Sequence, residues 1–161
     1  MKNLIVYYSY SGNTRKIAEI LAEYLGGAEI IELKCLEEIT SFIGQARKAF
    51  WHKKSEIMDV KLDLKEYDLI CLGTPVWAFG PAPAMNMFLD KCLGVDNKKI
   101  VLFSTYGSGV GKDRCLNYMQ SVLAKKKASE FKRFSIQQAN VKDREVVISK
   151  IKEVLPLSLN G

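Results

Sequence analysis

The chain has 161 residues, of which 48% are hydrophobic and 26% charged, and its formal net charge at pH 7 is +6. These values fit one globular domain of ordinary size and exclude disordered, collagen-like and disulfide-scaffold classes. The longest apolar run, Leu4–Tyr8, is far shorter than the roughly 20 residues that span a bilayer, and too short for a signal peptide. We therefore predict a single domain over residues 1–161, in the cytoplasm and without a membrane span.

Cysteine and histidine, which support most zinc and thiol chemistry, are few and widely spaced. Cys35, Cys71, Cys92 and Cys115 show neither a zinc-finger nor a CxxC spacing. We interpret them as small buried hydrophobic residues in a reducing cytosol. The single histidine, His52, lies in a basic stretch, where a solvated ring is expected. The sequence thus predicts no metal site and no catalytic residue.

The positive charge is spread along the chain. Basic residues gather in four places: residues 47–54, Lys98-Lys99, Lys125-Lys126-Lys127 and Lys132-Arg133. The lysine triplet suits the end of a helix, where cations complement the macrodipole. This dispersed pattern does not favour nucleic-acid binding, but a basic protein that docks on another protein should prefer an acidic face.

The chain opens with a continuous apolar and aromatic run, Asn3–Ser9, which predicts a buried strand. Apolar residues from Ile17 to Tyr24 then recur with helical spacing, and a pair of glycines ends this helix. Ala28–Leu33 is a second predicted strand. A weaker helical pattern covers Cys35–Lys54, and Glu56–Tyr67 is predicted as a connection.

The third predicted strand is Asp68–Gly73. After it, Pro81 and Pro83 suit the first turn of a helix, whose apolar stripe continues to Cys92. Lys99–Ser104 is the fourth predicted strand.

A helix is predicted over Gly111–Lys127, a fifth strand over Phe131–Ile136, and a closing helix over Asp143–Leu155, ended by Pro156. Strand and helix thus alternate five times, which is typical of an α/β fold with a parallel sheet and helices on both faces. In such sheets ligands bind beyond the carboxyl ends of the strands, so the loops there are the candidate site.

The loop between the first strand and the first helix carries three hydroxyl side chains within six residues. Ser9, Ser11 and Thr14 can each donate a hydrogen bond to a phosphate, and Gly12 permits a tight turn. The helix N-terminus behind them adds unpaired backbone amides. The alternative is an ordinary helix N-cap by Asn13 or Ser11. The density of hydroxyls favours a phosphate site.

Two further loops follow strands at the same predicted edge. Gly73–Pro81 contains no charged residue and presents Trp77 and Phe79, which could stack on a planar ring or simply cover the next helix. Ser104–Gly111 has the pattern GxGxG, which matches neither a dinucleotide loop nor a Walker loop. It is better explained as a flexible wall with one exposed aromatic, Tyr106.

Together these loops resemble the flavin-binding loops of the flavodoxin family. Ile5–Thr14 is similar to the family's phosphate-binding signature, and Gly73–Ala78 with Pro81–Pro83 to its second flavin loop. The resemblance covers essentially the whole chain. It implies a flavodoxin-like doubly wound five-stranded parallel sheet in the order 2-1-3-4-5, with FMN where the strand order reverses. The short connection between Ile136 and Asp143 is similar to that of short-chain members.

The resemblance also assigns residues to the cofactor. It implies that the first loop holds the FMN phosphate, that Trp77 stacks on the inner face of the isoalloxazine and that Tyr106 covers the outer face. The implied FMN-binding residues are Ser9, Tyr10, Ser11, Gly12, Asn13, Thr14, Thr74, Pro75, Val76, Trp77, Ala78, Phe79, Ser104, Thr105, Tyr106, Gly107 and Gly109.

This chain departs from the family's acidic electron carriers. It is basic, residues 73–81 and 104–111 contain no acid, and Lys112 and Arg114 follow directly. Positive charge beside a flavin stabilises its anionic reduced form, so we expect a less negative potential than in an acidic flavodoxin. The implied function is an electron carrier, monomeric or weakly dimeric, whose redox partners have acidic docking faces. The alternatives are an FMN-dependent NAD(P)H:quinone reductase and a scaffold without tight flavin binding.

Overall fold

The computed structural model describes residues 1–35 and 60–156. Apart from Cys35, the helix predicted over Cys35–Lys54 lies outside the described residues, and so does His52. The first part of the predicted connection Glu56–Tyr67 lies outside them as well.

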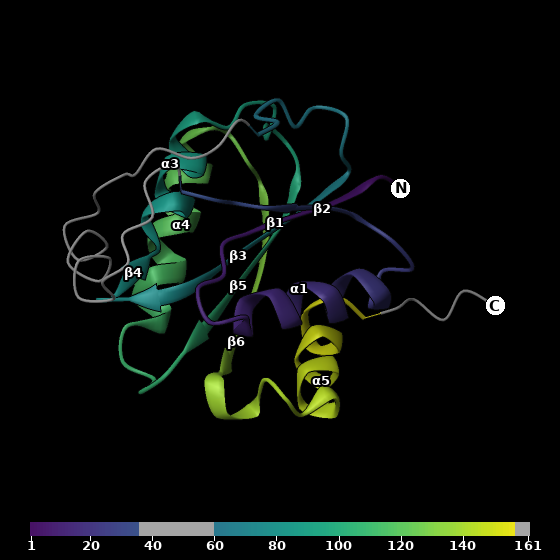
Figure 1. Ribbon diagram of the computed structural model, residues 1–161. Helices are drawn as coiled ribbons and strands as arrows, with labels where there is room; N and C mark the ends of the chain where they lie inside the picture. The colour runs from purple at the N-terminus through teal and green to yellow at the C-terminus, as the bar shows by residue number, and fades with distance from the viewer. Residues whose placement is uncertain (36–59, 157–161) are drawn as a thin grey trace.

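The parallel strands of the described residues form one sheet in the order β2-β1-β3-β5-β6 (Figure 1). They are β1 (Asn3–Tyr7), β2 (Glu29–Glu32), β3 (Leu69–Trp77), β5 (Lys99–Tyr106) and β6 (Glu130–Gln137). In chain order this is the predicted arrangement 2-1-3-4-5, so the doubly wound α/β fold is confirmed. β4 (Gly80–Pro81) is an addition that pairs antiparallel with the end of β3.

β3 is longer than the predicted strand Asp68–Gly73. Gly73 does not end it, because residues 73–75 stay paired with Phe103–Thr105 of β5. The glycine is needed for packing, since a Cβ there would overlap the ring of Phe103. β3 therefore continues to Trp77 and turns back through β4. Pro81, predicted for the first turn of a helix, lies in β4, opposite Val76.

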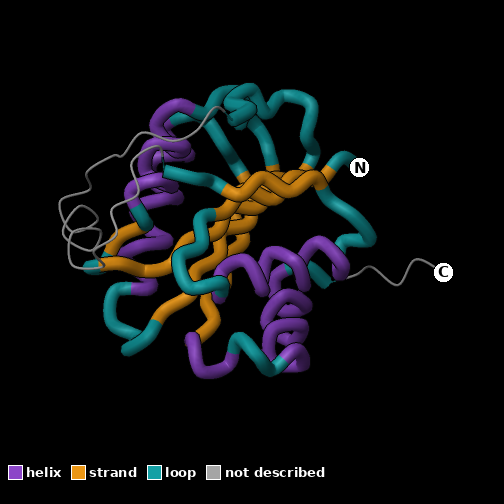
Figure 2. The backbone as a smooth tube through the Cα atoms, viewed as in Figure 1, coloured by secondary structure: helices purple, strands orange, loops and turns teal. Residues whose placement is uncertain are grey.

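Helices cover both faces of the sheet, as Figure 2 shows. On one face lie α1 (Asn13–Tyr24) and α5 (Arg144–Val154), and on the other α3 (Pro83–Lys91) and α4 (Lys112–Lys125). A short 3-10 helix, η1 (Gln138–Asn140), follows β6. The α5 start agrees with its prediction, since the side chain of Asp143 accepts hydrogen bonds from the amides of Glu145 and Val146.

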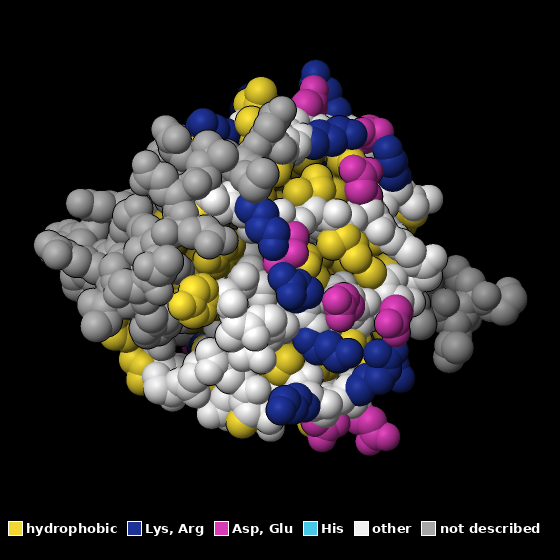
Figure 3. Space-filling model, in the orientation of Figure 1, with side chains coloured by type: hydrophobic (Ala, Val, Ile, Leu, Met, Phe, Trp, Pro, Cys, Tyr) yellow, Lys and Arg dark blue, Asp and Glu magenta, His cyan; other side chains and the backbone are white. Residues whose placement is uncertain are grey.

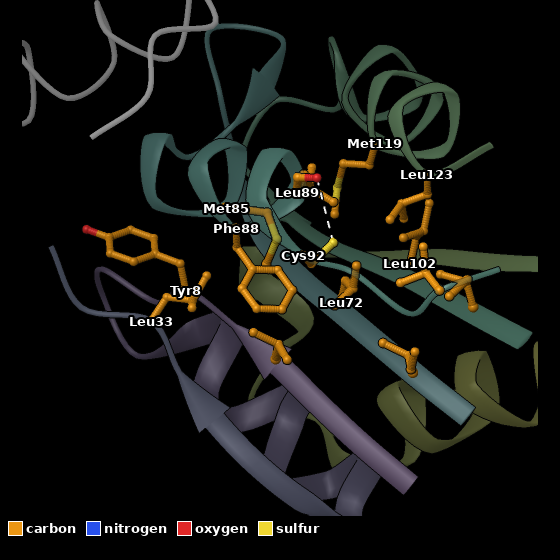
Figure 4. Close-up of a cluster of buried hydrophobic side chains, with 14 of the residues drawn as sticks. Tyr8, Leu33, Leu72, Met85, Phe88, Leu89, Cys92, Leu102, Met119 and Leu123 are labelled. Carbon is orange, nitrogen blue, oxygen red and sulfur yellow. Dashed lines mark hydrogen bonds between the residues drawn. The ribbon is translucent and has the colours of Figure 1, made fainter. Parts of the chain in front are cut away.

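The central strands are continuous buried runs because both of their faces are covered. In register, Val6, Leu72 and Leu102 face α3 and α4, while their neighbours Ile5 and Cys71 face α1 and α5. Figure 4 shows the first of these two clusters, into which Met85 and Phe88 of α3 and Met119 and Leu123 of α4 project.

Three cysteines belong to this core, as predicted. Cys71, Cys92 and Cys115 are buried, and all four cysteines of the chain are free. Burial raises the pKa of the Cys115 thiol to about 12 and also raises those of Cys71 and Cys92. These thiols are therefore protonated and unreactive at neutral pH. Cys35 is partly exposed.

The lysine triplet at the end of α4, Lys125-Lys126-Lys127, also makes hydrogen bonds to the end of α3. The ammonium of Lys126 donates to the carbonyl oxygens of Asp90 (2.6 Å) and Cys92 (2.8 Å), at the end of α3. Lys127 adopts a left-handed conformation just beyond α4. The end of α4 thereby satisfies carbonyl groups that the end of α3 leaves open.

Charges of both signs are mixed on the surface. Figure 3 shows Lys and Arg side chains scattered over one face and interleaved with Asp and Glu. Within residues 1–35 and 60–156, no helix has the length and apolarity needed to cross a membrane. The same residues contain no group of three or more His, Cys, Asp or Glu placed to hold a metal ion.

Candidate cofactor site

The three candidate loops meet at one edge of the sheet. β1, β3 and β5 are parallel neighbours, so their carboxyl ends lie side by side (Figure 1). The amide of Tyr8 donates to the carbonyl of Gly73 (3.1 Å) and so extends the β1–β3 pairing beyond β1. The loops that follow form one surface, as the sequence predicts.

The first loop is organised around the hydroxyl of Ser9. Its Oγ accepts hydrogen bonds from the amides of Gly12 and Arg15, each at 3.2 Å. Gly12, with φ of +91°, is the N-cap of α1 and provides no side-chain cap. The alternative of an ordinary N-cap by Asn13 or Ser11 is therefore wrong. Ser9 instead takes up the amide of Arg15 in the first turn of α1, and in the described residues the amides of Asn13 and Thr14 stay open.

The open end of α1 has the features of an anion cradle. Within the described part of the chain, the amides of Asn13 and Thr14 meet no acceptor. A Cβ at Gly12 would have no atom within 4 Å. Ser11 is exposed and Ser9 half-buried beside these amides. Free amides, hydroxyls and the positive end of the helix dipole together suit a phosphate group.

A buried pair of hydroxyls joins the first loop to the third. The Oγ1 atoms of Thr14 and Thr105 are 3.0 Å apart, and each residue is 1% exposed. Thr105 was assigned to the wall of the ring site by resemblance, but its hydroxyl contacts the start of α1.

The second loop is a tight hairpin between β3 and β4. Ala78 (φ 46°) and Phe79 (φ 68°) both adopt the left-handed region, as a two-residue turn of this hand requires. Neither is glycine, so each position stores strain of about 1–3 kcal/mol. The base of the hairpin is held by buried Thr74, whose hydroxyl donates to the carbonyl of Pro75 and accepts from the amide of Ala82, both at 3.0 Å.

The aromatic residues of this edge differ in exposure. Trp77 is only 6% exposed and packs edge-to-face against Tyr8 and Tyr10, with ring centroids 5.7 Å apart in both pairs. Phe79 is 38% and Tyr10 49% exposed. The apolar aromatic surface open to a planar ring is thus that of Phe79 and Tyr10. The stacking role of Trp77 stays a prediction, and the structure places this side chain in the core.

The third loop contacts the hairpin through a residue that the sequence analysis did not assign. Gly111, with φ of +87°, lies under Phe79: a Cβ there would overlap the Phe79 ring and come within 2.9 Å of its Cα. Gly111 is the last glycine of the GxGxG pattern, and this pattern is the sequence feature that could have identified it. Gln137, whose Nε2 donates to the carbonyl of Gly107 (3.1 Å), had no such signal.

A cation lies over the aromatic ring of the third loop. The ammonium of Lys112 lies 4.7 Å from the centroid of the Tyr106 ring. That Lys112 lies near the flavin stays a prediction.

On the other side, beside the first loop, Arg15 is paired with Glu32 at 2.5 Å. Burial alone would raise the pKa of Glu32, but hydrogen bonds from Arg15 and Lys34 hold that pKa below its usual value. Burial raises the pKa of Tyr7, against a hydrogen bond from Arg15. The guanidinium of Arg15 is thereby directed toward β2.

The implied site residues divide by exposure. Those at least partly exposed at this edge are Ser9, Tyr10, Ser11, Gly12, Asn13, Val76, Ala78, Phe79, Tyr106, Gly107 and Gly109. Those buried beneath it are Thr14, Thr74, Pro75, Trp77, Ser104 and Thr105. Among the buried residues, the Ser104 hydroxyl bonds to that of Ser135 across the β5–β6 pair (2.8 Å).

The chain is similar to known flavoproteins. A family model described as flavodoxin matches residues 2–143. The chain is similar to a flavoprotein in complex with FMN from Lactobacillus acidophilus NCFM, with 24% identity, 89% of this chain and 98% of that chain covered, and a TM-score of 0.67. It is also similar to a flavodoxin from the domain Archaea, with 19% identity, 96% of this chain and 99% of that chain covered, and a TM-score of 0.61. The same holds for oxidised flavodoxin 2 from Bacillus cereus, with 21% identity, 95% of this chain and 99% of that chain covered, and a TM-score of 0.58.

Proposed function

Because this chain belongs to the flavodoxin family, we propose that it carries electrons between redox partners on a non-covalently bound FMN. The family supports FMN as the cofactor, and the observation that carries the proposal is the open N-terminus of α1 at the carboxyl edge of the sheet. When bound, FMN supplies the redox chemistry, while the protein orients it and sets its electrostatic surroundings.

The residues present fit the two ends of such a cofactor. Ser9, Ser11 and the free amides of Asn13 and Thr14 would hold the phosphate. The exposed ring of Phe79, on the neighbouring hairpin, would contact the isoalloxazine. A charged end and a planar apolar end thus each meet a surface of matching chemistry.

Exposed apolar side chains around the same edge support contact with partner proteins. Tyr10, Phe79 and Val110 are 49%, 38% and 64% exposed, one in each loop. Exposed aromatic side chains are common anchors at protein interfaces. With Lys112 beside them and a net charge of +6, we expect partners with acidic docking faces. Electron-transfer rates that are insensitive to salt would contradict this expectation.

One observation favours the alternative, a two-electron FMN-dependent NAD(P)H:quinone reductase. Lys112 over Tyr106 places a cation where the outer face of the ring is expected. A nearby cation stabilises the anionic, fully reduced flavin and so favours transfer of two electrons together.

Stepwise anaerobic reduction of the FMN-loaded protein, followed by visible absorbance, separates the two functions. Two resolved one-electron steps would support the carrier. Direct bleaching in one step would support the reductase, and NAD(P)H oxidation with quinone acceptors would then be measured. Failure of the purified apoprotein to bind FMN would contradict both and leave the scaffold.

A further inference from the structure

The buried hydroxyl pair of Thr14 and Thr105 joins two chain segments far apart in sequence. Thr14 is the second residue of α1, and Thr105 stands near the end of β5, opposite Pro75 on one side and Ile136 on the other. The two oxygens are 3.0 Å apart and both residues are 1% exposed. Bulk water is therefore excluded from this contact.

The two hydroxyl groups have one proton more than the hydrogen bond between them uses. Two hydroxyls carry two protons, and the hydrogen bond between them uses one. Within residues 1–35 and 60–156, neither Oγ1 has a second hydrogen-bond partner. One buried hydroxyl proton is therefore left without an acceptor, which is unfavourable unless a bound group accepts it.

The surroundings indicate which proton is left and what accepts it. The amides of Asn13 and Thr14 at the same helix end are also without acceptors in the described residues. The positive end of the α1 dipole favours an anion beside them. If Thr105 donates to Thr14, the proton left over belongs to Thr14, on the helix end where that anion would lie. The reverse arrangement would leave it on the sheet, farther from the amides.

We propose that Thr105 is a positioning residue of the phosphate cradle. Its hydroxyl donates to Oγ1 of Thr14, and this bond directs the proton of Thr14 to a phosphate oxygen of FMN. A hydroxyl that accepts one hydrogen bond becomes a stronger donor of another. The inference rests on the proposed function, and it replaces the role in the ring wall that the resemblance implies for Thr105.

Comparison of two flavins tests the proposal. Riboflavin has the same ring as FMN but no phosphate, so a phosphate-positioning residue affects FMN alone. We expect Thr105→Val to weaken FMN binding about fivefold, as for the loss of one hydrogen bond. Riboflavin binding should change less than twofold. Dissociation constants come from quenching of flavin fluorescence on titration with apoprotein.

Three further variants show whether the effect passes through Thr14. Thr105→Ser keeps the hydroxyl and should restore FMN binding. Thr14→Val with Thr105→Val should bind FMN no more weakly than Thr14→Val alone, because the second change removes a bond already lost. If Thr105→Val does not fold, Thr105→Ala replaces it in the same series.

Ser135→Ala is the matched control. It breaks a similar hydroxyl pair with Ser104 (2.8 Å), between β5 and β6 and on the opposite face of the sheet from Thr105. It should leave the ratio of FMN to riboflavin affinity unchanged, and thermal unfolding of each apoprotein shows what either change does to stability.

The outcomes separate the inference from the proposed function. Equal losses for FMN and riboflavin in Thr105→Val, or no loss for either, would overturn the positioning role. Additive losses in the double variant would overturn it as well. A wild-type protein with no preference for FMN over riboflavin would instead contradict the proposed phosphate site.

Discussion

The starts of α1 and α4 have almost the same local geometry and opposite surroundings. Gly12 has φ and ψ of 91° and −8°, Gly111 of 87° and −7°, and neither helix has a side-chain cap at its N-cap residue. A Cβ at Gly12 would meet open space, whereas at Gly111 it would collide with Phe79. One helix end is therefore open to a ligand and the other is covered by the hairpin.

This difference shows that a glycine-capped helix end is an anion site only when nothing else occupies it. In the described residues, the end of α1 keeps the amides of Asn13 and Thr14 free because the Ser9 hydroxyl accepts from the amides of Gly12 and Arg15 instead. Phe79 covers the end of α4 because a strained two-residue turn directs it there. The same backbone conformation thus leaves one helix end open and forms a packing contact at the other.

The largest expected effect comes from Gly111→Ala. The new methyl group would strain a left-handed position and collide with Phe79, so we expect the apoprotein to lose about 3 kcal/mol of unfolding free energy. Urea denaturation measures the loss. A loss no greater than that of Gly12→Ala would show that the contact with Phe79 is unimportant.

Ser9→Ala should have the next largest effect. It removes the acceptor of two amide hydrogen bonds in the first loop, with an expected loss of about 1–2 kcal/mol, as for other helix caps. FMN binding should weaken by at least about tenfold, since a hydrogen bond to a charged group is worth about 1.5–3 kcal/mol. Ser121→Ala, on an exposed turn of α4, is the control and should change neither quantity. Unchanged FMN affinity in Ser9→Ala would remove Ser9 from the cradle.

Gly12→Ala tests the open end of α1 directly. The expected loss of stability is about 1 kcal/mol, because strain at a positive φ is the only cost where no atom lies nearby. Equilibrium denaturation measures the loss of unfolding free energy in this variant and in Gly111→Ala. The difference between the two losses is the cost of the collision with Phe79 of the hairpin. Equal losses in the two variants would remove the contrast between the helix ends.

The smallest expected effect concerns the potential. Lys112→Gln removes the cation over Tyr106. The reduction potential of the step that forms the fully reduced flavin should become more negative by at most about 40 mV, equivalent to about 1 kcal/mol for one electron. Lys125→Gln, at the far end of α4, removes the same charge and serves as the control. An equal shift in both variants would indicate net charge rather than position, and potentiometry with redox dyes measures both.

Much of the fold could be predicted because it follows from short-range patterns. Continuous apolar runs such as Asn3–Ser9 predict strands buried on both faces, of which the structure shows Asn3–Tyr7, and glycines predict the end of α1. The β3–β4 hairpin was missed because Gly73 resembles a strand end. A glycine is needed at position 73 because the ring of Phe103, on another strand, packs against it.

The sequence by itself determined the alternation of strands and helices, and through it the edge where the loops meet. It also determined the hydroxyl-rich loop before α1. Only the tertiary structure decided the protein partner of each hydroxyl there: Thr14 is paired with Thr105, Thr74 with the amide of Ala82, and Ser104 with Ser135. A motif states which polar groups are present, but their partners come from other strands and turns. Whether a hydroxyl meets a ligand or the protein therefore depends on contacts that local sequence does not encode.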